Sequence, residues 1–285
     1  MAAPTPSSHL VPVDDLTYHY LRWGEADRPA VLLLHGLRSY AATWAPLAAE
    51  LSGTHQVIAP DLRGRGRSSW DPARNYFTST YVRDVAALAE SLGLDRFSIV
   101  GHSLGGAVGY AYAARHPAQV DALIVEDIGP GSSTETAGAG RILREIGRTP
   151  DSFDSLDDVR AYWRGIRPGI TAEALESRIE HTVHPGAGGN WEWTLDMAGI
   201  GAARRGEDPA GPVDLWAAVD QLRCPTLVIR GDRSDFLSAE TCVRMARRQP
   251  RLRWAEVPAA GHYVHDDNPG EFTRLVTEFL DRGER

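Results

Sequence analysis

Short apolar runs alternate along the chain with longer stretches in which apolar residues recur every three or four positions. The runs Ala30–Leu34 and Phe97–Val100 are largely apolar, as expected for strands buried on both faces. The run Leu16–Trp23 alternates in part and is rich in Tyr and Thr, which is typical of a strand near a sheet edge. Further runs of strand length are Gln56–Ala59, Ala122–Val125, Thr226–Ile229 and Leu252–Val257.

Helical periodicity fills the intervals between these runs. In the stretch Ser79–Leu92, for example, Val82, Val85 and Ala89 lie on one helical face. Other stretches of this kind are Leu104–Arg115, Ala239–Arg248 and Pro269–Leu280. Strands that alternate with helices predict an α/β fold, in which a mostly parallel sheet is covered by helices on both sides.

The alternation stops between Ile128 and Leu222, where the pattern predicts no strand. A connection between parallel strands needs only about a dozen residues, so this segment is an insertion. Its predicted helices are Ile142–Ile146, Asp157–Arg164, Thr171–His184 and Val213–Leu222, with Asp157 and Thr171 as expected N-caps. We therefore expect a core domain of residues 1–130 and 212–285 and a helical cap of residues 131–211.

The segment Gly101–Gly106 has the sequence Gly-His-Ser-Leu-Gly-Gly and stands between a predicted strand and a predicted helix. A G-x-S-x-G segment in this position is a nucleophile elbow, in which the sharp turn holds the serine hydroxyl away from the sheet. The pattern predicts Ser103 as a catalytic nucleophile.

A serine hydroxyl needs a base, and on this scaffold the base is a histidine near the end of the chain. His262 follows the last predicted strand after a short loop and is the predicted base. His265 is the alternative, with a packing or capping role as its simpler interpretation.

The acid that orients the histidine is expected after the strand Thr226–Ile229. Asp235 is the predicted acid because it lies further into that loop, just before the next helix. Asp232 is the alternative, or a turn former after Gly231. Asp127, at the end of an earlier strand, is a third possibility that we interpret as a turn residue or an anchor of the insertion.

Two backbone amides are needed to bind the oxyanion of an acyl-transfer reaction. The amide of Leu104 directly follows the nucleophile, and the amide of Leu37 lies in the loop after the strand Ala30–Leu34. These two residues are the predicted oxyanion hole.

The amino-acid composition excludes several reaction mechanisms and argues against several classes of partner. All 30 basic residues among the 285 are Arg, and the missing Lys excludes Schiff-base, pyridoxal phosphate and P-loop mechanisms. The net charge of −8 argues against nucleic acid and anionic membranes as partners. Two cysteines, Cys224 and Cys242, lack metal-binding spacing, so no metal site is expected. Met1–Ser8 lacks a basic start and an apolar run, which predicts a frayed tail on a cytoplasmic protein.

The combined motifs resemble the α/β-hydrolase superfamily. Beyond the elbow they are His35-Gly36, Asp61–Ser68, Val125–Pro130, Gly231–Leu237, Gly261-His262 and Asp267–Pro269. The resemblance implies an eight-stranded, mostly parallel sheet flanked by helices, with a helical cap after the sixth strand and no cofactor. It also favours Asp235, because the second Asp of a G-x-x-S-D segment usually supplies the acid in this family.

Within that family, Ser103 disfavours the dehalogenase-like and epoxide hydrolase-like members, which use Asp as nucleophile. We expect a serine hydrolase that cleaves a small to medium, apolar or aromatic ester or lactone through an acyl-enzyme. A C–C bond hydrolase and a cofactor-free haloperoxidase would use the same triad and remain alternatives. A small-molecule receptor on a hydrolase fold is the non-enzymatic alternative.

Aromatic residues of the insertion and of the predicted loops are candidates for substrate contact, since rings facing a cleft favour apolar ligands. These candidates are Tyr40, Trp44, His102, Trp163, Trp191 and Trp193. The alternative for each ring is a purely structural role, either in attaching the lid to the core or in local packing.

Overall fold

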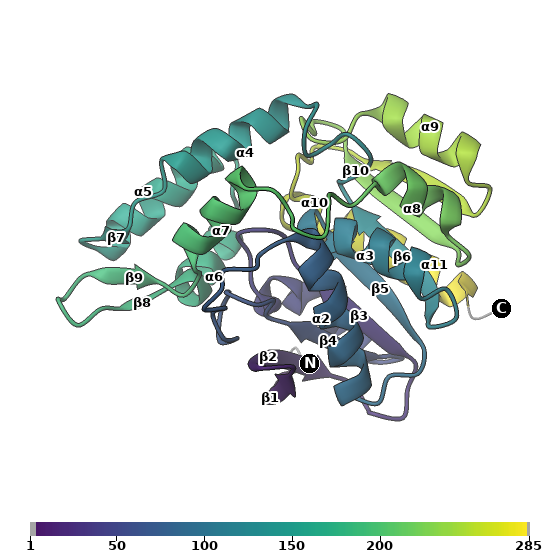
Figure 1. Ribbon diagram of the computed structural model, residues 1–285, viewed down its shortest axis with the longest axis horizontal. Coiled ribbons are helices and arrows are strands. Elements are labelled where there is room, and N and C mark those ends of the chain that lie inside the picture. The colour runs from purple at the N-terminus through teal and green to yellow at the C-terminus, as the bar shows by residue number, and fades with distance from the viewer. Residues whose placement is uncertain (1–3, 284–285) are drawn as a thin grey trace.

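The computed structural model describes residues 4–283, and their strands form one sheet of eight and one of three. The large sheet has the order β1-β2-β4-β3-β5-β6-β10-β11 (Figure 1). Its strands are β1 (Ser7–Val13), β2 (Leu16–Trp23), β3 (Ala30–Leu34), β4 (Gln56–Pro60), β5 (Phe97–His102), β6 (Val120–Glu126), β10 (Thr226–Gly231) and β11 (Leu252–Val257). The pairs β1–β2 and β2–β4 are antiparallel and the others are parallel, as predicted.

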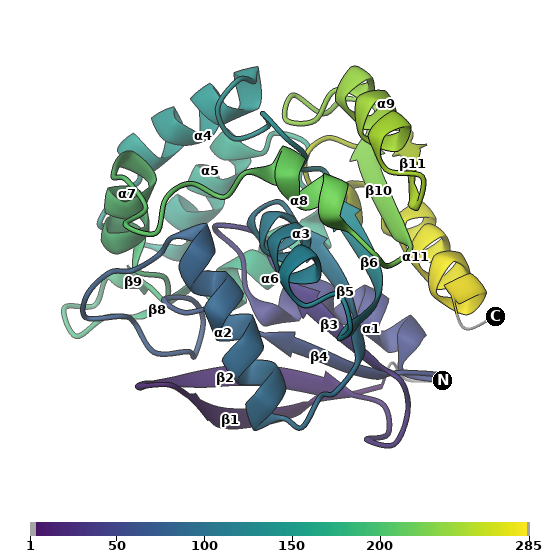
Figure 2. The same ribbon diagram turned by 45° about the vertical axis from the view of Figure 1, so that its right-hand side comes forward.

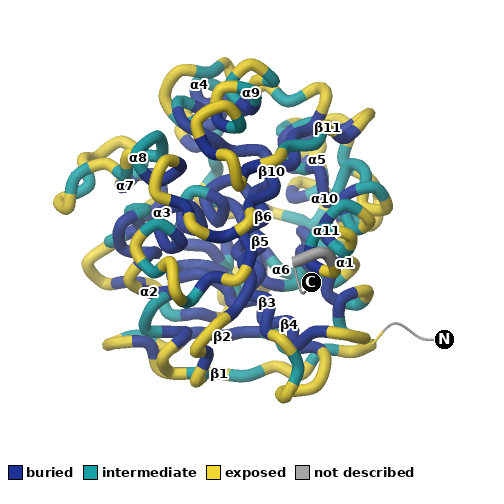
Figure 3. The backbone as a smooth tube through the Cα atoms, turned by 90° about the vertical axis from the view of Figure 1, so that its right-hand side faces the viewer, coloured by how far each residue is buried: buried dark blue, intermediate teal, exposed yellow. Residues whose placement is uncertain are grey.

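Helices cover both faces of this sheet (Figure 2). One face carries α2 (Thr78–Ser91), α3 (Leu104–Arg115), α8 (Leu215–Gln221) and α9 (Ala239–Arg248). The other carries η1 (Ala41–Trp44), α1 (Ala45–Leu51) and α11 (Pro269–Gly283). The short α10 (Val264–Asp267) precedes α11. The central strands are buried along their whole length (Figure 3), which explains their uninterrupted apolar sequences.

The segment between β6 and β10 contributes no strand to the large sheet. Its elements are α4 (Ala137–Gly147), β7 (Ser152–Phe153), α5 (Leu156–Ile166), α6 (Ala172–Thr182), β8 (Val183–Pro185), β9 (Trp191–Trp193) and α7 (Met197–Arg205), followed by α8. We call residues 131–211 the inserted segment. Its helices α4, α5 and α7 gather on one side of the sheet (Figures 1 and 2).

The expectation that the insertion has no strand was wrong. Strands β7, β9 and β8 form a small antiparallel sheet, and elements of two or three residues are too short to show a periodicity. Thr171 caps α6 as predicted, since its hydroxyl accepts a hydrogen bond from the amide of Ala174. For α5 the cap is Ser155 instead of Asp157.

The prediction of a frayed tail over Met1–Ser8 is wrong for its last two residues. Ser7 and Ser8 belong to β1, which pairs with β2 along its whole length. Only Val11 and Val13 of this edge strand are buried. Its polar residues and Pro12 are not typical of a strand, so the sequence pattern did not predict it. Residues 1–3 of the predicted tail lie outside the described residues.

Candidate active site

Ser103 forms the turn between β5 and α3, with φ 50° and ψ −111°. This conformation is strained for a residue with a side chain and persists because its neighbours are packed around it. A Cβ at Gly101 would lie 2.4 Å from the carbonyl oxygen of Gly105, and a Cβ at Gly105 would lie 2.0 Å from that of Leu34. The elbow therefore needs glycine at both positions, as the sequence pattern predicted.

His262 lies in the loop between β11 and α10, and its Nε2 is 3.0 Å from Ser103 Oγ. Both side chains are buried, with about 6% of each residue exposed. The structure thus brings together the predicted nucleophile and the predicted base, which 159 positions separate in the chain.

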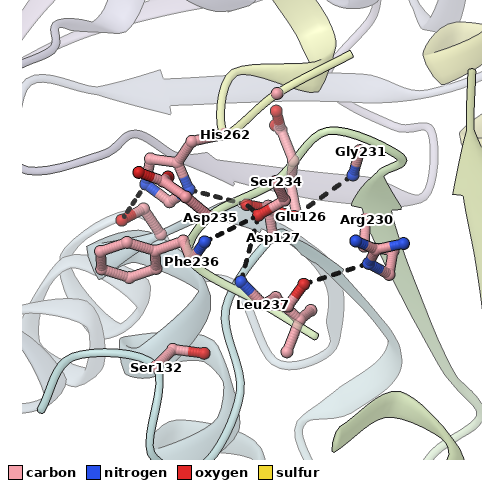
Figure 4. Close-up of polar contacts among 12 residues, drawn as sticks. Glu126, Asp127, Ser132, Arg230, Gly231, Ser234, Asp235, Phe236, Leu237 and His262 are labelled. Atoms are coloured by element: carbon pink, nitrogen blue, oxygen red, sulfur yellow. Dashed lines mark hydrogen bonds and ion pairs between the residues drawn. The ribbon is translucent and has the colours of Figure 1, made fainter. Parts of the chain in front are cut away.

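Asp127 is fully buried, and its Oδ2 is 2.8 Å from Nδ1 of His262. A carboxylate accepts a hydrogen bond, so Nδ1 carries the proton and the lone pair of Nε2 faces Ser103. The amide of Gly231 donates to Oδ1 of Asp127 at 3.2 Å, and the Ser234 hydroxyl donates to Oδ2 at 2.5 Å. Figure 4 shows His262 and Ser234 converging on this carboxylate.

Asp235, the predicted acid, pairs with Arg141 in the structure, and His262 pairs with Asp127. The carboxylate of Asp235 accepts two hydrogen bonds from Arg141 of α4, at 2.8 and 2.9 Å. Arg141 also holds the pKa of Asp235 below its usual value. The alternative, Asp232, accepts a hydrogen bond from the amide of Ala260 at 3.2 Å. The prediction of Asp235 as the orienting acid is therefore corrected to Asp127.

Strand register explains this correction. His102 and Glu126 are register partners in the adjacent strands β5 and β6, so Ser103 and Asp127 emerge side by side. Asp127 has φ 52°, which turns its side chain out of the strand direction at once. Asp235, by contrast, lies four residues beyond the end of β10. The sequence shows that Asp127 comes just after a predicted strand, but only the strand order of the structure places that strand next to the nucleophile strand.

Leu37 and Leu104, the predicted oxyanion residues, both line a cavity of about 640 Å³. Neither amide has a hydrogen-bond acceptor among residues 4–283, so both are available to a ligand. Arg65 donates to the carbonyl oxygen of Leu37 at 3.1 Å and so helps to hold this loop.

His35 supports the same loop from within the core. Its Nδ1 lies 2.8 Å from the carbonyl oxygen of Gly36, and the amide of Leu62 donates to Nε2 at 3.0 Å. One nitrogen donates and the other accepts, so the ring is neutral. Burial lowers the pKa of His35 to about 4, which agrees with these contacts.

His265, the alternative base, has other partners. Its Nδ1 is 2.8 Å from the carboxylate of Glu126, and its Nε2 is 3.1 Å from Thr43 Oγ1. Burial opposes the charged ring, but the carboxylates of Glu126 and Asp266 outweigh this effect and raise the pKa of His265. These contacts match the packing role considered for it.

Each of the six aromatic candidates for substrate contact lies against other residues of the protein. His102 Nε2 is 2.8 Å from the carbonyl oxygen of His262, and Tyr40 donates to Ser177 Oγ at 2.9 Å. Trp44 packs near His265 and Phe272. Trp163 and Trp193 contact each other edge to face, and Trp191 is half-buried in β9. Contact of these rings with a substrate stays a prediction.

Within residues 4–283, no cluster of three or more His, Cys, Asp and Glu side chains is arranged to hold a metal ion. No helix in that range combines the length and the hydropathy needed to cross a membrane.

Comparisons with known proteins fit this geometry. Residues 31–275 match the model of the alpha/beta hydrolase family. The 2-(acetamidomethylene)succinate hydrolase of Mesorhizobium japonicum is 30% identical over 285 residues, which cover 99% of each chain. The 3-hydroxybutyrate-oligomer hydrolase of Cupriavidus necator is 31% identical, covering 87% of this chain and 86% of that one.

A solved structure of E-2-(acetamidomethylene)succinate hydrolase superposes with a TM-score of 0.85 at 29% identity, covering 97% of this chain and 99% of the other. The family match spans more than half of the chain, and the two relatives described above are both hydrolases. This chain belongs to the alpha/beta hydrolase family.

Proposed function

We propose that this protein is a serine hydrolase that acts in the cytoplasm on a small-molecule ester or lactone through an acyl-enzyme on Ser103. The observation that carries the proposal is the hydrogen-bonded chain from Ser103 through His262 to Asp127. A serine nucleophile is activated by an imidazole that accepts its proton. A buried carboxylate on the other side of the ring fixes the tautomer of that imidazole.

In the proposed reaction, Ser103 Oγ attacks the carbonyl carbon of the substrate while Nε2 of His262 takes the hydroxyl proton. The amides of Leu37 and Leu104 donate to the oxyanion. The carbon–oxygen bond of the ester then breaks, and the leaving alcohol receives the proton from His262. Water, activated by the same nitrogen, attacks the acyl-enzyme, and the carboxylic acid product leaves Ser103 protonated. Asp127 stabilises the imidazolium that forms in both steps.

The inserted segment acts, in this proposal, as the cap over the reaction site. Arg167 and Arg178 both donate to the carboxylate of Asp266, which lies four residues after His262. The hydroxyl of Tyr40 donates to Ser177 of α6. These contacts join α6 and the residue after α5 to α10 and to Tyr40, so the segment can exclude water from the site.

An ester or lactone suits the site for two reasons. Ser103 as the nucleophile calls for an acyl group, and the two free amides offer an oxyanion pocket. The name of the Cupriavidus relative describes an oligomer of a hydroxy acid, whose units join naturally through esters. A C–C hydrolase and a haloperoxidase use the same triad, so product analysis separates them from an esterase.

The test compares the wild type with Ser103→Ala on p-nitrophenyl esters of two to eight carbons and on simple lactones. We expect Ser103→Ala to lower kcat by roughly 10³-fold or more, while Ser91→Ala, an exposed serine at the end of α2, keeps the wild-type rate. Undiminished hydrolysis by folded Ser103→Ala contradicts the proposal. A folded wild type that hydrolyses none of these compounds and takes no fluorophosphonate label favours the receptor alternative.

A further inference from the structure

The cavity of about 640 Å³ joins the predicted oxyanion hole to the inserted segment. Leu37 and Leu104 line it from the core, while Leu143 of α4 and Arg204 of α7 line it from the insertion. A group bound beside Arg204 therefore lies in the cavity that both predicted oxyanion residues line.

Arg204 is half-buried, and it differs from three buried arginines of the core and the insertion, Arg38, Arg63 and Arg178, each of which has a carboxylate partner. Its Nε atom is buried without a hydrogen-bond partner, and the side chain makes no ion pair with any residue in the range 4–283. Arg38 binds Glu145, Arg63 binds Asp71 and Asp84, and Arg178 binds Asp266. A buried N–H group without an acceptor is costly, because it loses hydration and gains no hydrogen bond in return.

Neither of the two acidic residues that line the cavity is a counter-ion for Arg204. Glu135 is exposed. Asp208 accepts hydrogen bonds from the Ser79 hydroxyl and the amide of Ala210, both at 2.9 Å. Burial lowers the pKa of Arg204, opposed by the phenol of Tyr81, and no carboxylate contributes to the balance. Arg204 is thus a cation on the cavity wall for which the described part of the chain provides no counter-ion.

We infer that Arg204 binds a carboxylate group of the substrate, so that the hydrolysed ester or lactone carries a second, ionised acid group. A guanidinium donates two parallel hydrogen bonds to a carboxylate, which gives both affinity and orientation. With the carboxylate at Arg204, the other end of the molecule is directed toward the amides of Leu37 and Leu104. This inference deepens the proposed function and rests on it for the chemistry at Ser103.

The experiment uses two esters of equal chain length, mono-p-nitrophenyl glutarate and p-nitrophenyl valerate. The measured quantity is the ratio of their kcat/KM values. We expect Arg204→Gln to lower this ratio by about tenfold to a hundredfold, and Arg204→Lys to lower it less, because the charge remains. Arg205→Gln is the matched control, since Arg205 is the exposed neighbour and lines a different cavity; its ratio should equal that of the wild type.

A second readout does not depend on turnover. Glutarate binding is measured by calorimetry in Ser103→Ala and in Ser103→Ala with Arg204→Gln, and we expect about tenfold to hundredfold weaker binding in the double variant. Equal ester ratios in the wild type and Arg204→Gln, or equal or absent glutarate binding in the two variants, overturn the role of Arg204. If the wild type takes no fluorophosphonate label, the proposed function fails separately, and the calorimetry still decides whether Arg204 binds a carboxylate.

Discussion

Asp127 Oδ2 lies 2.8 Å from His262 Nδ1, although the two residues are 135 positions apart. The contact exists because Asp127 ends the strand beside the nucleophile strand. Ser103 and Asp127 also share a left-handed backbone, with φ values of 50° and 52°. Two adjacent parallel strands thus end in matching sharp turns, and the loop after β11 brings the imidazole between the two side chains.

This geometry predicts which carboxylate matters for catalysis. Asp127→Asn keeps the shape of the side chain but can no longer stabilise the imidazolium, so we expect kcat to fall by roughly 10³- to 10⁴-fold. Steady-state hydrolysis of a p-nitrophenyl ester measures this loss.

Asp235→Asn and Asp232→Asn are the matched controls, and we expect each to lower kcat by less than about tenfold. Asp235 holds Arg141 of α4, so its variant should mainly weaken the attachment of the insertion. A larger loss in Asp235→Asn than in Asp127→Asn would return the role to the loop after β10.

The elbow glycines predict a difference in stability. Gly105→Ala places a methyl group 2.0 Å from the carbonyl oxygen of Leu34, so β3 or α3 must shift. We expect the free energy of unfolding to fall by about 2–4 kcal/mol, measured by urea denaturation. Gly165→Ala in α5, where nothing lies within 4 Å, should keep or raise stability. Equal midpoints for the two variants would show that the elbow is not tightly packed.

His35 predicts a dependence of stability on pH. Its folded pKa of about 4 lies below the ordinary value of 6.5, so the unfolded chain binds the proton more readily. The stabilisation is present above pH 6.5 and is lost as the pH falls toward 4, by about 3 kcal/mol in all.

Urea unfolding of the wild type and His35→Gln between pH 7.5 and 4.5 measures this effect. We expect the wild type to lose more stability than His35→Gln across that range, while the exposed control His184→Gln follows the wild type. Parallel pH profiles for the wild type and His35→Gln would contradict a neutral, buried ring.

The ion pairs of Asp266 predict how firmly the insertion is held. Asp266 accepts from both Arg167 and Arg178. Burial opposes the charged carboxylate, but His265 and the two arginines outweigh this effect and hold the pKa of Asp266 well below the usual range. Asp266→Asn leaves the buried Arg178 without a carboxylate partner, while Arg167 keeps Asp267, so we expect a loss of about 3 kcal/mol in the free energy of unfolding. Glu176→Gln, which breaks an exposed pair with Arg160, should leave the midpoint unchanged. Similar midpoints for the two variants would mean that the buried pairs add little.

The sequence was most informative for regular helices and strands and for motifs whose residues are contiguous in the chain. Strands β2, β3 and β11 and helices α3 and α9 begin and end where their patterns predict, because the spacing of apolar residues changes at their bounds. The elbow at Ser103 was readable because a strand, a serine between glycines and a helix stand next to each other.

The acid was harder to predict because its position depends on strand order. Asp127 and Asp235 both follow strands, and a linear pattern does not say that β6 lies between β5 and β10. Once that order is known, the register of His102 with Glu126 selects Asp127. Arg204 carried no local signal either, because its missing counter-ion is visible only after the insertion is packed on the core.

The most direct test of the account is the site at which a fluorophosphonate reacts. We predict that mass spectrometry of the labelled native protein finds the adduct on Ser103, that His262→Gln abolishes labelling, and that Asp127→Asn slows it by roughly 10²-fold or more. An adduct on another residue, or labelling of Ser103 at an equal rate without the imidazole, would contradict the triad of Ser103, His262 and Asp127.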